Sequence, residues 1–391
     1  MSFVDQLLYD LISIPSENPG GNEKAIASYC AEMLRKHQLD VQIVSDDPDR
    51  PNVICQIGRG DGPTMILQGH LDTKPAAHNG SEIEEWLRSD PFTPFEEQGL
   101  VYGLGACDTK GGVAAQLAAF VALSKRRDLA GTVIWQGVVD EENGSRHGAE
   151  LLLARGLLSA DAAIVAEPTG GIPSFDQLGN CWTQLHVKGK AAHGGLPWLG
   201  VDAIAVALEV LRLMQRRVAD MPRDTRYLSH PLVRAGAIHG GGHAGTVASE
   251  CTLVTDIRVR PGERRELYLS MWRVVVAEAR SLFPECQIQL DLYAGGGCEP
   301  HAIDADGAYA GAVHRAWREM SGVALEPTPF FGGSDARYFA EAGTPAIVLG
   351  PGNLAQAHAP NEFVPIEEVR RTATVIETIV DIVCGSARRY R

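Results

Sequence analysis

The feature that most constrains the fold of this chain is the alternation of short apolar strands with helical segments over its first 177 residues. Runs of apolar and β-branched residues predict strands at residues 52–57, 64–68, 132–139 and 162–166. Helical periodicity predicts helices at residues 25–36, 111–124 and 150–155. Strands separated by helices are typical of an α/β sheet with parallel pairs.

The pattern changes near Gln177 and changes back near residue 295. Between these points, three strand-like segments alternate with two helices, an order typical of a separate α+β unit: residues 182–190, 201–217, 253–260, 263–283 and 287–292. An apolar strand at 346–349 and a final helix follow. We therefore predict an α/β domain with a mixed, largely parallel sheet and helices on both faces, made of residues 1–177 and 295–391. A smaller α+β domain, residues 178–294, interrupts it.

Composition and charge exclude several classes of function. The 391 residues are 45% hydrophobic and carry a formal net charge of -14 without a dense Lys/Arg run, so we expect no nucleic-acid partner. No stretch approaches the roughly 18 apolar residues that span a membrane, and residues 1–15 form an amphipathic pattern rather than a signal peptide. The eight cysteines are scattered without a CxxC pair, so we expect no disulfide framework and a cytoplasmic protein.

Acidic and histidine residues recur where the predicted strands end or in the loops after them. In open α/β sheets this edge is where ligands bind. Asp72 stands two residues after His70, on the same side of an extended segment, where it can hold the His70 ring as a metal ligand. The other positions are Asp108, the pair Glu141 and Glu142, Glu167, and His358.

The glycine-rich segment around Asp108, residues 103–112, has an alternative interpretation. Glycine-rich turns before helices also bind phosphate. This segment is neither a Walker motif nor GxGxxG, and an Asp in its middle suits a cation better than a phosphate. Taken together, two histidines and several carboxylates predict a zinc site, with Co²⁺ or Mn²⁺ possible. There are enough carboxylates for two metal ions that share one ligand.

On these residues the chain resembles the M20 metallopeptidase family, which includes acetylornithine deacetylases, succinyl-diaminopimelate desuccinylases, aminoacylases and glutamate carboxypeptidases. The resemblance covers almost the whole chain. Besides the ordered set of site residues, it rests on four local segments: residues 11–16 with Asn18 and Pro19, Trp86, residues 90–92, and residues 102–105.

The resemblance implies a role for each of these residues. Asp108 bridges two Zn²⁺ ions, His70 and Glu167 complete one site, and Glu142 and His358 complete the other. Asp72 orients His70. Glu141 is the general base, which takes a proton from the metal-bridged water and passes it to the leaving nitrogen. The peptide bond after the bridging Asp is commonly cis in this family.

The inserted unit resembles the family's dimerisation domain, so the resemblance implies a homodimer. It gives His193 the role of reaching into the partner's active site to stabilise the oxyanion. Arg258 stands where the family has an Arg that meets a substrate carboxylate. Gly333 and Ser334 lie in a segment similar to a loop that lines the substrate pocket. His239 and His243 lie in a region that departs from the family pattern, and we interpret both as ordinary loop histidines.

The sequence therefore predicts a two-zinc amidohydrolase of the deacetylase or desuccinylase type, acting on a small N-acyl amino acid. A dipeptidase or carboxypeptidase of the same family is the alternative, because its site would look the same. A non-catalytic binding protein with this fold would be expected to have lost Glu141 or a metal ligand, and all of these residues are present.

Overall fold

The computed structural model describes residues 1–76, 85–87, 90–227 and 231–385. The chain divides into two compact units. The larger unit contains residues 1–176, 302–330 and 334–391, and the smaller unit contains residues 177–301 and 331–333. Among the described residues, no helix combines the length and the apolar character that crossing a membrane requires. All eight cysteines are free.

A six-stranded sheet forms the centre of the larger unit, in the order β1-β2-β6-β3-β7-β14. β6, β3, β7 and β14 run parallel to one another, whereas β2 is antiparallel to both of its neighbours. The predicted α/β class with a mixed, largely parallel sheet is therefore confirmed. The strands are β1 (Val41–Val44), β2 (Asn52–Gly58), β3 (Thr64–His70), β6 (Thr132–Val138), β7 (Ala162–Val165) and β14 (Ala346–Val348).

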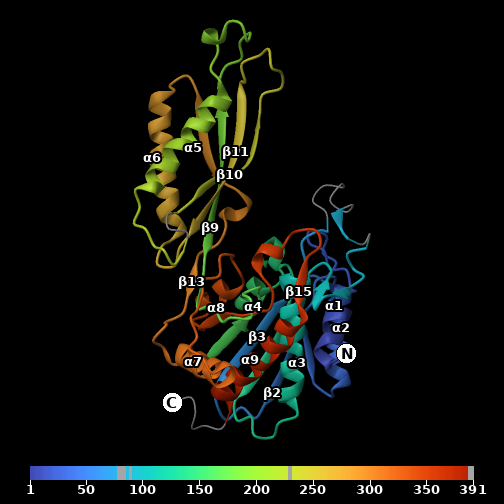
Figure 1. Ribbon diagram of the computed structural model, residues 1–391. Coiled ribbons are helices and arrows are strands. Elements are labelled where there is room, and N and C mark those ends of the chain that lie inside the picture. The colour runs from blue at the N-terminus through green and yellow to red at the C-terminus, as the bar shows by residue number, and fades with distance from the viewer. Residues whose placement is uncertain (77–84, 88–89, 228–230, 386–391) are drawn as a thin grey trace. The chain divides into compact units, whose positions relative to one another are not determined.

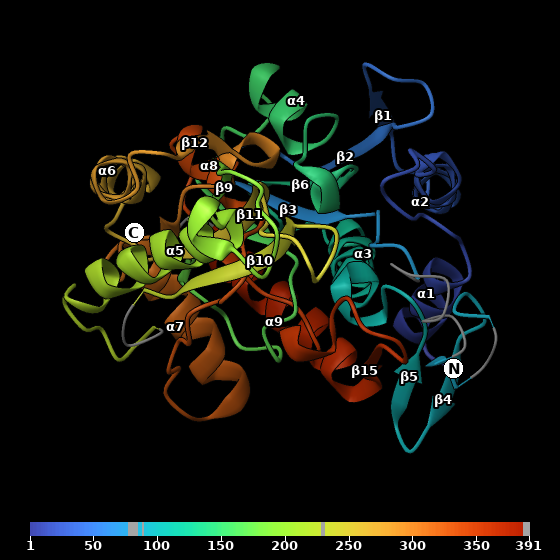
Figure 2. The same cartoon turned by 90° about the horizontal axis from the view of Figure 1, so that it is seen from above.

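Helices cover both faces of this sheet because successive side chains of a strand point to opposite faces. Met65 and Leu67 of β3 pack on one side, with apolar residues from five helices. Ile66 packs on the other side, with apolar residues from two helices. Figure 2 shows α4 on one side of β3 and β6, and α1, α3 and α9 on the other. The first group is α1 (Phe3–Ile12), α2 (Lys24–Lys36), α3 (Gly111–Ser124), α7 (Ala308–Ser321) and α9 (Ile366–Cys384), and the second is α4 (Ala149–Ala154) and α8 (Ala336–Glu341).

Helix α3 lies against the sheet beside α9 (Figure 1). It is apolar on nearly all sides, and most of its residues are buried. A helix with this composition belongs in a core rather than at a surface. β4 (Phe95–Glu97) and β5 (Leu100–Tyr102) precede α3 in the chain. They form a three-stranded sheet with β15 (Phe363–Pro365), which directly precedes α9.

The smaller unit contains a four-stranded antiparallel sheet in the order β10-β11-β9-β12, with α5 and α6 packed on one face. The sequence predicted only three strands here and missed β10, so that prediction was wrong. β10 lies at the edge of the sheet, and most of its residues are exposed, so it lacks the alternation of a half-buried strand. The elements are β9 (Gly179–Lys188), α5 (Ala203–Ala219), β10 (Val233–Gly240), β11 (Glu250–Val259), α6 (Arg265–Leu282) and β12 (Gln287–Leu292), and the short strands β8 (Asp176–Gln177) and β13 (His301–Ala302) pair with each other.

Candidate metal centre

The carboxyl ends of four neighbouring parallel strands meet at one edge of the larger sheet. β3 ends on His70, and short loops follow β6, β7 and β14 at the same edge. A further segment, between β5 and α3, contributes Asp108. Residues far apart in the sequence are thereby brought together, as expected at this edge of an α/β sheet. They form two clusters of potential metal ligands.

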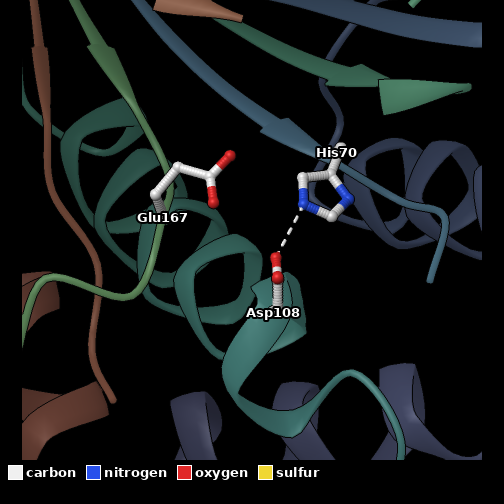
Figure 3. Close-up of side chains that lie close together, drawn as sticks. All are labelled: His70, Asp108 and Glu167. Atoms are coloured by element: carbon white, nitrogen blue, oxygen red, sulfur yellow. Dashed lines mark hydrogen bonds and ion pairs between the residues drawn. The ribbon is translucent and has the colours of Figure 1, made fainter. Parts of the chain in front are cut away.

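The first cluster is His70, Asp108 and Glu167, and all three side chains are buried. Each offers one ligand atom, and these atoms lie within 4.8 Å of one another. His70 Nε2 lies 3.1 Å from Asp108 Oδ1. Figure 3 shows the carboxylate of Glu167 directed toward the other two side chains.

The second cluster is Asp108, Glu142 and His358, with ligand atoms within the same 4.8 Å. His358 Nε2 lies 3.3 Å from Asp108 Oδ2 and 3.2 Å from Glu142 Oε1. Asp108 therefore belongs to both clusters and faces a different histidine with each of its oxygens. This is the arrangement expected of a carboxylate that bridges two metal ions. The peptide bond from Asp108 to Thr109 is cis, as the resemblance implies.

Ionisable side chains are concentrated in these clusters, and those of the first cluster are buried. In the chain without metal ions, burial raises the pKa of Glu167 well above its ordinary value, and Asp108 and Glu141 raise it further. Burial lowers the pKa of His358, but its hydrogen bonds with Asp108 and Glu142 outweigh this and bring the pKa to about 10. Several carboxylates crowded into a low-dielectric site favour a divalent cation. Histidine nitrogens and carboxylate oxygens are donors that zinc accepts, and cobalt and manganese accept them as well.

Asp72 is buried beside the first cluster and holds the backbone that follows β6. Its Oδ1 accepts the N–H of Glu141 at 3.2 Å, and its Oδ2 accepts the N–H of Glu142 at 3.1 Å. His70 Nδ1 lies 2.9 Å from the backbone carbonyl oxygen of Asp72 and 3.5 Å from Oδ1. Asp72 thus contacts His70 mainly through its main chain, while its carboxylate positions Glu141 and Glu142.

Glu141, the expected general base, stands between Asp140 and Glu142 just after β6. Burial raises the pKa of its carboxyl group to about 8; His70 lowers this pKa, whereas Asp335 and Glu142 raise it. A carboxyl group whose pKa lies near the working pH is suited to accepting and releasing a proton.

Behind Asp72 lies a hydrogen-bonded network that the sequence did not predict. Asn18 Nδ2 donates to Asp72 Oδ2 at 2.8 Å and to Asp140 Oδ1 at 3.0 Å. Arg50 forms ion pairs with Asp140 at 2.8 Å and with Glu23 at 2.6 Å. Asn18 lies in one of the segments that carry the family resemblance, and that resemblance could have indicated a role for it. No feature of the sequence indicated a role for Arg50.

Two further unpredicted residues contact the clusters. Lys74 Nζ lies 3.3 Å from Glu142 Oε2 and also donates to the backbone carbonyl of Glu142. Glu362 accepts hydrogen bonds from the backbone around Asp108. Both residues stand within four positions of a predicted ligand, His70 and His358 respectively.

A small pocket with a volume of about 40 Å³ lies beside His358. Trp86 in its wall is buried and donates its indole N–H to the carbonyl of Ala76. Apart from His358 the lining is apolar: Pro75, Ala76, Trp86, Leu104, Ala359 and Pro360.

The smaller unit contains three of the predicted site residues. His193 is exposed, and its Nδ1 accepts the N–H of Gly195 at 3.1 Å. Arg258, on β11, is half-buried, and its Nε donates to Asp256 Oδ2 at 3.2 Å. Gly333 belongs to the smaller unit, whereas the buried Ser334 belongs to the larger one.

His239 and His243 also lie in the smaller unit, and both are exposed. His239 is on the edge strand β10. His243 Nδ1 accepts the N–H of Gly245 at 3.0 Å. Neither belongs to the two candidate clusters, so the interpretation as ordinary histidines stays a prediction.

The chain is similar to a known peptidase family and to several known proteins. The sequence model of peptidase family M20/M25/M40 matches residues 66–381. The chain is 28% identical to an acetylornithine deacetylase of Vibrio atlanticus (strain LGP32), over 97% of this chain and 95% of that protein. It is 24% identical to a probable succinyl-diaminopimelate desuccinylase of Staphylococcus aureus (strain MSSA476), over 92% of each. The solved structure of a tripeptidase from Staphylococcus aureus subsp. aureus Mu50 superposes with a TM-score of 0.79 at 23% identity, over 98% of each chain.

Proposed function

This chain belongs to peptidase family M20/M25/M40 and is a hydrolase of amide or peptide bonds. From that premise we propose that the enzyme uses two bound zinc ions to remove the acyl group from a small N-acyl amino acid. The observation that carries the proposal is the pair of clusters that share Asp108, next to Glu141. The names of the two relatives, a deacetylase and a desuccinylase, favour an acyl group over a peptide.

In the proposed mechanism, His70 and Glu167 would hold one ion, Glu142 and His358 would hold the other, and Asp108 would contribute to both sites. When bound, such ions polarise the substrate carbonyl and lower the pKa of water. The carboxylate of Glu141 takes the proton from the attacking water and delivers it to the leaving nitrogen. The hydrogen bond from the N–H of Glu141 to Asp72 fixes the main chain from which this carboxylate extends.

The proposed substrate has a carboxylate, and Arg258 binds it with its planar guanidinium group. In this proposal, Gly333 and Ser334 contact the amino-acid part of the substrate. The protein acts as a homodimer, in which the exposed His193 of one chain stabilises the developing oxyanion in the site of the other. Exposure of His193 supports this role, because a side chain buried within its own unit could not reach a second chain.

For the acyl group, we propose a short apolar chain such as acetyl. The pocket beside His358 supports this choice, because its apolar lining suits a methyl group better than the charged end of a succinyl group.

The test is a substrate panel: one amino acid with N-acetyl, N-succinyl or N-formyl groups, and dipeptides of the same residue, each with added Zn²⁺ or Co²⁺. We expect kcat/KM for the N-acetyl substrate to exceed that for the dipeptides at least about tenfold, equivalent to about 1.4 kcal/mol. We also expect a chelator to abolish turnover. Hydrolysis of dipeptides alone would instead establish the peptidase alternative.

A further inference from the structure

Glu362 has a buried carboxylate whose three hydrogen bonds all go to the main chain of one loop. Its Oε2 accepts the N–H of Gly105 at 2.8 Å. Its Oε1 accepts the N–H of Cys107 at 2.7 Å and that of Asp108 at 2.8 Å. The backbone carbonyl of Glu362 also accepts the N–H of Gly103 at 3.0 Å. One residue therefore binds the segment from Gly103 to Asp108 at four points.

The main chain of this loop is irregular, although it forms hydrogen bonds from the N–H of Ala106 to Gly103 and from the N–H of Lys110 to Gly105. Asp108 and Thr109 have backbone angles outside the helical region. Gly105 has φ 78°, and a Cβ there would lie 2.6 Å from the Thr73 side chain. An irregular buried loop needs partners for its N–H groups, and here the carboxyl group of one side chain accepts hydrogen bonds from three of them.

The position of Glu362 in the chain links it to the second cluster. It stands four residues after His358 and directly before β15. β15 pairs with β5, the strand that leads into the same loop. The segment from His358 to Glu362 therefore supplies one candidate ligand and holds the loop that supplies another. Asp108, the ligand shared by both clusters, is also one of the residues whose N–H donates to Glu362.

We propose that Glu362 is the positioning residue of the metal centre: its carboxylate holds the loop from Gly105 to Asp108 so that Asp108 faces both His70 and His358. Glu362 is not a ligand itself, since its oxygens point at backbone N–H groups. This inference rests on the two-metal site of the proposed function but is independent of the substrate.

The experiment compares the Zn²⁺ affinity of the wild-type chain with that of Glu362→Gln, by competition with a zinc-binding dye. Gln has nearly the same volume, but its NH₂ group must face at least one backbone N–H, so one or more hydrogen bonds become donor–donor contacts. Loss of a residue that orients a ligand typically lowers metal affinity about 10–100-fold, and we expect a change of that size. The visible spectrum of the Co²⁺-loaded variant should also change, because Asp108 would coordinate differently.

Glu368→Gln is the matched control. Glu368 Oε2 likewise accepts a backbone N–H, that of Gly352 at 2.9 Å, but Gly352 is not a candidate ligand. We expect wild-type affinity and spectrum for this variant. If Glu362→Gln does not fold, Glu362→Asp replaces it: the carboxylate is kept but is one methylene too short to reach all three N–H groups, so its affinity should also fall.

A folded Glu362 variant with wild-type Zn²⁺ affinity and Co²⁺ spectrum would overturn the inference. Equal losses in Glu362→Gln and Glu368→Gln would do the same, because they would show a general effect of the substitution. If the wild-type chain binds two ions and Glu362→Gln binds them weakly, but no N-acyl amino acid is hydrolysed, then the proposed function fails and the inference stands.

Discussion

Asp108 is the residue on which both halves of the candidate centre depend. Each of its oxygens faces a different histidine, and both clusters contain it. Its hydrogen bonds with those histidines outweigh burial and hold its pKa below the ordinary value for Asp. Around it, Asp72 and Glu362 bind backbone N–H groups rather than other side chains. Buried carboxylates therefore hold much of the main chain around the site by accepting hydrogen bonds from its N–H groups.

Glu141 allows a direct test of the proposed proton transfer. Glu141→Gln should keep both metal ions but lower kcat about 10²–10⁴-fold, because an amide cannot accept the proton. The measurements are kcat and metal content of the same preparation. Glu150→Gln, on the exposed side of α4, is the control and should behave as wild type. Near-normal turnover in a fully loaded Glu141→Gln variant would show that another group is the base.

At the scale of elements, the sequence was most informative where a segment is strongly apolar. The helix predicted at 111–124 has the bounds of α3, and the strand predicted from residue 64 is β3. β1, β4, β5 and β15 were not predicted, because each is short and only partly buried, whereas the equally short β7 and β14 are fully buried and apolar. β10 was missed because an exposed edge strand has no buried face.

The residues of the candidate site also fall into two groups, those that the sequence predicted and those that it did not. The five candidate ligands could be found because each stands near a predicted element and in a recognisable order. Apart from Asp72, the residues that position them could not be found, because their partners are remote in the sequence: Asn18 and Asp140 are 122 positions apart, and Glu362 and Asp108 are 254 apart. Only the folded sheet brings such pairs together.

Helix α5 provides a prediction on stability. Asp202 is its N-cap, and the side chain accepts the N–H of Ile204 at 2.9 Å and that of Ala205 at 3.2 Å. Asp202→Ala should lower the free energy of unfolding by about 0.5–2 kcal/mol. Asp220→Ala at the other end of α5 is the matched control; there a negative charge faces the negative end of the helix dipole, so its removal should be neutral or slightly stabilising. Urea unfolding of both variants checks this, and equal losses would contradict the capping argument.

On the scale of the whole molecule, the proposed role of His193 requires two chains. His193→Ala and Glu141→Ala should each be nearly inactive as homodimers. In a mixed dimer, one site would combine an intact Glu141 from the first variant with an intact His193 from the second. Doubly tagged mixed dimers should therefore recover up to about half of the wild-type activity, given that catalysis needs both groups in one site. Confirmed mixed dimers that remain as inactive as the parents would show that His193 does not act across an interface.

The most direct test of the central claim, that this chain holds two metal ions that share Asp108, is the number of Zn²⁺ ions bound per chain. Elemental analysis after dialysis against Zn²⁺ should give two ions for the wild-type chain, about one for Glu167→Ala and for His358→Ala, and none for Asp108→Ala, because only Asp108 belongs to both clusters. Circular dichroism establishes that each variant is folded. A wild-type chain that binds no zinc, or a folded Asp108→Ala variant that still binds two ions, would contradict the account.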